Sequence, residues 1–166
     1  MKLDWILIPE TEREAFAESL VNEGEKQGVI DVVRNFAKPL YSAFLPTLEH
    51  LRAVVIHDLS GRLDNKRSIL LPDGKPRTLG HFWDRMKANN YQFEGDWLRD
   101  CFPIMQNFDK NRLRIFVGGK REDKLADWGG EYLITDGAHR ALVAMRKYDE
   151  GLIYTPCPVF STEVNL

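Results

Sequence analysis

Residues 131–148 contain the feature that most restricts the fold of this chain: an apolar run, a glycine and an amphipathic segment in direct succession. The run 132–135 predicts a buried strand, Gly137 permits the backbone angle of a tight turn, and apolar residues at helical spacing follow as far as Tyr148. A strand that leads through a glycine into a helix presents the first N–H groups of that helix at the strand end. Because these groups lack intrahelical partners and carry a partial positive charge, they suit an anion such as phosphate.

The first turn of this predicted helix carries His139 and Arg140. The helix dipole disfavours a cation at this end by about 0.3–1 kcal/mol. An anionic ligand bound at this end would explain why two potential cations occur there. In the alternative interpretation, His139 is neutral and bonded to a backbone carbonyl, while Arg140 pairs with a surface acid. The complete pattern Asp-Gly-x-His-Arg between a strand and a helix favours the binding interpretation.

Asp136, at the end of the predicted strand, has two possible roles. As an N-cap it accepts a hydrogen bond from the amide of Ala138 or His139. As a metal ligand it holds a divalent ion such as Mg²⁺, which lets a carboxylate lie beside a phosphate without repelling it. The two roles do not exclude each other, and both stay open.

The rest of the chain alternates between helical and extended patterns. A capping box that starts at Thr11 predicts a helix to about residue 22, 29–37 and 79–89 are helical by spacing, 112–117 is a strand, and 53–56 fits either state. Pro156 and Pro158 place a last strand, 153–160, at a sheet edge or a bulge. The fold class is therefore α+β, with a small mixed sheet and packed helices. We expect residues 1–90 to form a helical N-terminal lobe on a core of residues 91–166, as one compact unit.

Composition restricts the classes of protein further. A chain of 166 residues with 43% hydrophobic residues can bury one core, and a net charge of -2 gives no reason to expect duplex DNA binding. The acidic residues of the first 50, among them Glu23 and Glu25, are typical of a solvated helix surface. The two cysteines, Cys101 and Cys157, form no disulfide or zinc pattern. No apolar run reaches the ~20 residues of a membrane span, so we expect a soluble cytoplasmic protein without a membrane partner. The oligomeric state stays open.

The sequence Glu-Tyr-Leu-Ile-Thr-Asp-Gly-Ala-His-Arg-Ala-Leu-Val-Ala-Met of 131–145, with Pro-Cys-Pro-Val-Phe of 156–160, resembles the ParB/sulfiredoxin superfamily. The likeness covers residues 97–160 and leaves the first 90 residues without one. Members bind nucleotide phosphates with a Gly-x-His/Arg-Arg turn, with or without magnesium. The resemblance therefore implies a ParB/sulfiredoxin-like fold in which Gly137, Ala138, His139 and Arg140 hold phosphate oxygens and Asp136 holds the metal ion.

Within this superfamily, the small-molecule kinases such as the free serine kinases are most similar in the Asp-Gly-x-His-Arg form. Sulfiredoxins carry a reactive cysteine where this sequence has Ala138. Partition proteins add a helix-turn-helix after the nucleotide domain, and because six residues follow Phe160, we expect that module to be missing here. The kinase members place a catalytic glutamate near the position of Glu94, although Asp96 competes for that role. The implied catalytic residues are Glu94, Asp136 and His139.

The predicted function is therefore that of an Mg²⁺-dependent phosphotransferase or nucleotide hydrolase. It would bind ATP, ADP or CTP and transfer a terminal phosphoryl group to a small hydroxyl compound. The alternatives are a ParB-like nuclease or nucleotide-gated DNA-binding protein, and a binding module without catalysis. The net charge of -2 disfavours nucleic acid as a partner.

Overall fold

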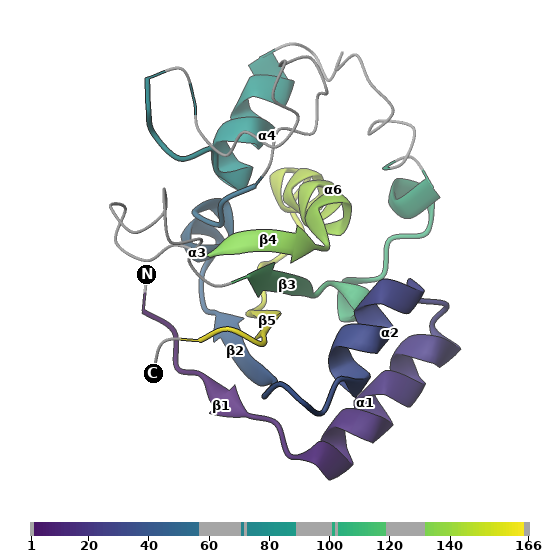
Figure 1. The fold of residues 1–166 in the computed structure, drawn as a ribbon. Coiled ribbons are helices and arrows are strands. Elements are labelled where there is room, and N and C mark those ends of the chain that lie inside the picture. Colours follow the sequence, from purple (N-terminus) through teal and green to yellow (C-terminus); the bar gives the residue numbers. More distant parts are fainter. Residues whose placement is uncertain are drawn as a thin grey trace.

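The computed structural model describes residues 2–56, 71, 73–88, 101, 103–118 and 132–164, which form an α+β fold around a five-stranded sheet (Figure 1). The strands, in the order β1-β2-β5-β3-β4, are β1 (Ile6–Leu7), β2 (Tyr41–Leu45), β5 (Cys157–Ser161), β3 (Ile115–Gly118) and β4 (Leu133–Asp136). β3 and β5 run parallel, and the other neighbours are antiparallel. The predicted α+β class with a mixed sheet is confirmed.

Helices cover both faces of this sheet (Figure 1). The helices of the described chain are α1 (Glu10–Asn22), α2 (Gln27–Arg34), α3 (Leu48–Arg52), α4 (Leu79–Ala88) and α6 (Ala138–Asp149), with a short 3₁₀ turn at Lys110–Arg112. In β3, Phe116 packs in the apolar cluster of α1 and α2, while Ile115 and Val117 pack in the larger cluster with α6. Because side chains alternate along a strand, β3 is buried on both faces.

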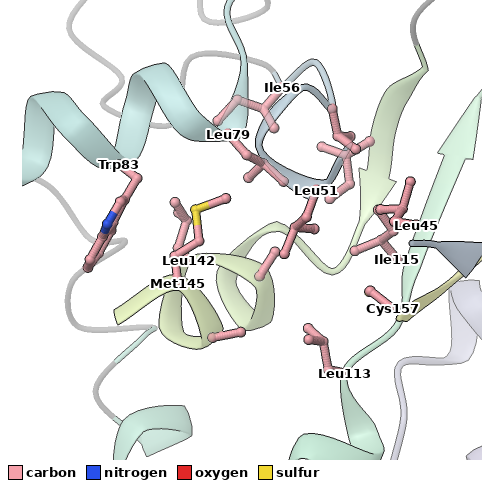
Figure 2. Packing of buried hydrophobic residues seen from close by; sticks show 14 of the residues in the cluster. Leu45, Leu51, Ile56, Leu79, Trp83, Leu113, Ile115, Leu142, Met145 and Cys157 are labelled. Atoms are coloured by element: carbon pink, nitrogen blue, oxygen red, sulfur yellow. The ribbon is translucent and has the colours of Figure 1, made fainter. Parts of the chain in front are cut away.

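The central turns of helix α6 are packed in the apolar core. Its residues 141–145 are all buried, and Figure 2 shows Leu142 and Met145 facing Leu79 and Trp83 of α4. At the C-terminal end of α6, Trp83 Nε1 donates a hydrogen bond of 2.9 Å to Asp149 Oδ2. The core therefore fixes the direction of α6 and, with it, the position of its N-terminus.

The first half of the chain is less helical than expected, because it also supplies strands. β1 and β2 join the same sheet as the C-terminal strands, and Val55, in the ambiguous run 53–56, bridges to Thr78 and Leu133. Helix α1 begins at Glu10 with Pro9 as its N-cap, so Thr11 lies inside the helix and the predicted capping box does not form. Over the described ranges, no helix has the length and apolar character that a membrane crossing requires.

The expectation that the last strand lies at an edge or a bulge is wrong. β5 occupies the centre of the sheet, with Phe44 of β2 opposite Pro158. The register between β5 and β3 begins only at Val159, opposite Ile115, and Pro156 precedes the strand. Pro158 has no N–H to donate, but β3 does not yet pair with β5 at this residue. The proline is therefore tolerated because no hydrogen bond to β3 is lost.

Candidate functional site

The turn between β4 and α6 has the conformation that its sequence predicts. Asp136 ends β4 opposite Phe116, and Gly137 is the N-cap of α6 with a left-handed φ of 95°. A Cβ atom at position 137 would lie 2.5 Å from the carbonyl oxygen of Arg114. Glycine is required here both by the backbone angle and by the close approach of the chain before β3.

The N-terminus of α6 is partly open to solvent. Residues 136–140 are all half-buried, and the N-cap residue of the helix, Gly137, has no side chain with which to bond the first N–H groups. The N-cap role considered for Asp136 is not observed, because Gly137 takes that position and the Asp136 carboxylate instead lies 3.8 Å from Lys26 Nζ. The turn therefore keeps the donor character that suits an anion.

Arg140 does not project freely into solvent, because the chain supplies it with an acid. Its Nη1 donates a hydrogen bond of 2.6 Å to Oε2 of Glu25, a carboxylate whose side chain is only 2% exposed. Glu25 belongs to the loop between α1 and α2, where it also accepts a bond of 3.0 Å from the backbone N–H of Lys26. The interpretation of Arg140 as paired with an acid is thus partly correct, although that acid is buried and distant in sequence.

Two further arginines complete the ion cluster. Arg114 Nε lies 3.9 Å from Glu25 Oε2, and its Nη2 pairs with Glu23, the second acid of the same loop. Arg112 Nε lies 3.8 Å from the Glu23 carboxylate. The cluster of Glu23, Glu25, Arg112, Arg114 and Arg140 therefore joins the α1–α2 loop to the N-terminus of α6, with three cationic and two anionic groups.

Burial and pairing shift the pKa values of these acids in opposite directions. Burial of Glu25 acts to raise the pKa of its carboxyl group, but the hydrogen bonds from Arg140 and from the backbone of Lys26 outweigh burial, so this pKa lies below its ordinary value. Burial raises the pKa of Asp136, and the nearby Lys26 offsets this only in part. Asp136 is therefore a stronger base than an ordinary aspartate, whereas Glu25 is a firmly ionised partner for arginine.

Two pockets flank this cluster. One, of about 210 Å³, is lined in part by Arg112 and Arg140. The other, of about 470 Å³, lies between α2 and the sheet and is lined in part by Lys26 and Asp136. The candidate site thus has a hollow lined by two arginines and Asp109 on the Arg140 side and a separate hollow on the Asp136 side.

A metal ion beside this turn would have one protein carboxylate available, that of Asp136. Within the described parts of the chain, no group of three or more His, Cys, Asp or Glu residues is arranged to hold a metal ion. Mg²⁺ at nucleotide sites commonly binds one or two carboxylates and takes its other ligands from phosphates and water. Asp136, which faces Lys26 at 3.8 Å, does not form a metal site by itself, so Mg²⁺ that arrives with a nucleotide would be held by the phosphates and water, and Asp136 would remain available as a base.

The structure brings together five of the predicted site residues, Asp136 to Arg140, in one turn. Glu94, the implied catalytic glutamate, and its competitor Asp96 lie outside the described residues. Sequence reasoning missed the ion cluster: Glu25 is buried, so its assignment to a solvated acidic surface is wrong. The alternation of Arg112 and Arg114 with apolar residues was visible, but no local signal connects them to an acid 90 residues earlier.

Comparisons with known proteins returned no matching family model, no matching curated protein and no matching solved structure. The likeness of residues 97–160 to the ParB/sulfiredoxin superfamily therefore stays a prediction. The features that bear on function are the turn at Gly137, the ion cluster and the two pockets.

Proposed function

We propose that this protein binds a nucleoside triphosphate or diphosphate by its phosphate groups at the N-terminus of α6, and transfers the terminal phosphoryl group to a small hydroxyl compound or to water. One observation carries the proposal: the half-buried turn at residues 136–140 begins α6 at a glycine N-cap, which has no side chain to bond the first N–H groups of the helix. Such a helix terminus favours phosphate through its donors and through the helix dipole.

The ion cluster supports an anionic ligand on this side of the molecule. A guanidinium group has five N–H donors, and Arg140 uses Nη1 for Glu25, so it keeps donors for phosphate oxygens. Arg112 and Arg140 line the same 210 Å³ pocket. Asp109 also lines this pocket, so a phosphate group would be held there by the remaining N–H donors of the arginines and not by an excess of positive charge.

Phosphoryl transfer suits such a site because its catalysis consists mainly of positioning and charge neutralisation. The α6 N–H groups and Arg140 hold the phosphate chain, and Asp136 accepts the proton of the attacking hydroxyl group or water. The raised pKa of Asp136 makes it a more effective general base than an ordinary aspartate. Mg²⁺ bound with the nucleotide supplies further charge neutralisation. The roles that the superfamily resemblance implies for Glu94 and His139 belong to the same proposal.

A thermal-shift experiment with ATP, ADP and CTP, with and without Mg²⁺, tests the proposal. At 100 times its dissociation constant, a nucleotide should stabilise the wild type by about 2.7 kcal/mol. Because Arg140→Ala also breaks the bond to Glu25, the quantity to compare is the ligand-induced shift of each variant. We expect this shift to be largely lost in Arg140→Ala.

The matched control is Arg34→Ala, which removes an exposed arginine of α2 that pairs with the equally exposed Glu14. Its ligand-induced shift should equal that of the wild type. The proposal fails if none of the three nucleotides shifts the wild type, or if Arg140→Ala responds as strongly as Arg34→Ala.

A further inference from the structure

The larger of the two pockets has no role in phosphate binding, yet it opens beside the proposed base. It measures about 470 Å³, within the range of about 300–1,000 Å³ typical of small-molecule sites. Its lining extends from α2 across β3 and β4 to the residues that follow β5. Asp136 is the residue that this pocket shares with the turn at Gly137.

The walls of this pocket are mainly apolar. Val29 and Val32 of α2 form one side, and Phe116 and Phe160 contribute to the other. The two phenylalanine rings stack with centroids 5.2 Å apart, so the sheet side is a preformed apolar surface. A ligand that fits these walls needs an aliphatic or aromatic body.

The charges at the pocket edge restrict the ligand further. Lys26 and Asp136 lie 3.8 Å apart and largely balance each other. Among the described lining residues, Lys26 is the one basic side chain, so this part of the lining offers no unbalanced cation to an anionic ligand. The pocket therefore does not suit a second phosphate or a carboxylate.

We infer that this pocket binds the phosphoryl acceptor, and that the acceptor is an alcohol with an apolar body and no negative charge. This inference rests on the proposed function. The hydroxyl group lies against Asp136, at the end of the pocket nearest to α6, and the apolar body lies between Val32 and the Phe116–Phe160 pair. The acceptor pocket and the pocket lined by Arg140 thus adjoin the same turn, one at Asp136 and the other at Arg140.

In the reaction, the hydroxyl oxygen of the acceptor attacks the terminal phosphorus of a nucleoside triphosphate. The new oxygen–phosphorus bond forms as the bond from that phosphorus to the bridging oxygen breaks. The hydroxyl proton passes to the Asp136 carboxylate, and the nucleoside diphosphate leaves with the electron pair of the broken bond. The products are a phosphate monoester, a nucleoside diphosphate and a protonated Asp136, which returns its proton to solvent.

The test measures binding of benzyl alcohol and of benzoate to the protein by NMR titration, without any nucleotide. Benzyl alcohol should shift the amide signals of α2 and β3 residues around the pocket, and benzoate should bind at least tenfold more weakly. Val32→Trp places a large side chain on the α2 wall, where Val32 is 40% exposed, and should weaken benzyl alcohol binding at least tenfold. Val21→Trp on α1 is the matched control, because Val21 is 49% exposed and does not line the pocket; it should bind as the wild type does.

Gly28→Phe is a second blocking variant in case Val32→Trp fails to fold, because a Cβ atom at this lining residue meets nothing within 4 Å. The inference is overturned if benzyl alcohol does not bind the wild type, if both blocking variants bind it normally, or if benzoate binds equally well. Nucleotide stabilisation is measured separately on the same variants. Benzyl alcohol binding without any nucleotide shift contradicts the proposed function, and a normal nucleotide shift without benzyl alcohol binding contradicts only the pocket assignment.

Discussion

Glu25→Ala should destabilise the protein by about 3–5 kcal/mol, the usual cost of removing one partner from a buried ion pair. The side chain of Glu25 is 2% exposed and receives Arg140 at 2.6 Å, with Arg114 at 3.9 Å. Without this carboxylate, two guanidinium groups beside each other lose their shared counter-charge. The effect is measured as the free energy of unfolding in urea at neutral pH.

The matched control for this variant is Glu14→Ala, which removes a glutamate from an exposed pair with Arg34. Surface pairs of this kind contribute about 0–1 kcal/mol, so the control should stay close to the wild type. A loss in Glu25→Ala no larger than in Glu14→Ala would show that the ion cluster does not hold the α1–α2 loop against α6.

The destabilisation should also depend on pH in a defined direction. Because the folded-state pKa of Glu25 is lowered, its contribution to stability is complete above the unfolded-state pKa, which is about 4.3 for glutamate. This contribution is lost as the pH falls through the lower folded-state pKa. The difference between wild type and Glu25→Ala should therefore be constant from pH 6 to 8 and shrink in acid.

Gly137→Ala has the second-largest expected effect, a destabilisation of about 2–5 kcal/mol. A left-handed conformation costs a residue with a Cβ atom about 1–2 kcal/mol, and a clash inside packed structure adds about 1–3 kcal/mol. The added Cβ would lie 2.5 Å from the Arg114 carbonyl oxygen and 3.2 Å from Ile115 Cα, so either β3 or the start of α6 has to move. The change is measured by urea unfolding, and nucleotide binding should weaken with it.

Gly151→Ala separates the two causes. Gly151 also has a left-handed φ, 106°, but a Cβ atom there meets nothing within 4 Å. This variant should lose only the conformational cost, about 1–2 kcal/mol. Equal losses in the two variants would mean that the chain before β3 yields to the new methyl group, and the close approach at position 137 would then have no structural importance.

The sequence predicted the strand–turn–helix unit at 132–149 closely, because every signal there is local. An apolar run, one obligatory glycine and a helical repeat lie within 18 residues, and the structure places β4, Gly137 and α6 on them. For the same reason, the sequence alone places Asp136 to Arg140 together in one turn.

Features that depend on distant parts of the chain were not predictable. The burial of Glu25 follows from Arg114 and Arg140, which lie about 90 and 115 residues away in sequence, and its neighbourhood in the sequence is simply acidic. The central place of β5 depends on where β3 begins to pair, so the general rule on strand prolines gave the wrong position. The strands β1 and β2 were missed because each is short and its partner lies far along the chain.

The most direct test of the central claim follows the backbone amide signals of Ala138, His139 and Arg140 in ¹⁵N-labelled protein as ATP is added with Mg²⁺. If the N-terminus of α6 binds phosphate through its N–H groups, these three signals should show the largest shifts in the protein and should saturate together. Inorganic phosphate should move the same signals at higher concentration. If ATP leaves these signals in place, whether or not it moves signals elsewhere, the turn at Gly137 is not a phosphate site and the proposed function is wrong.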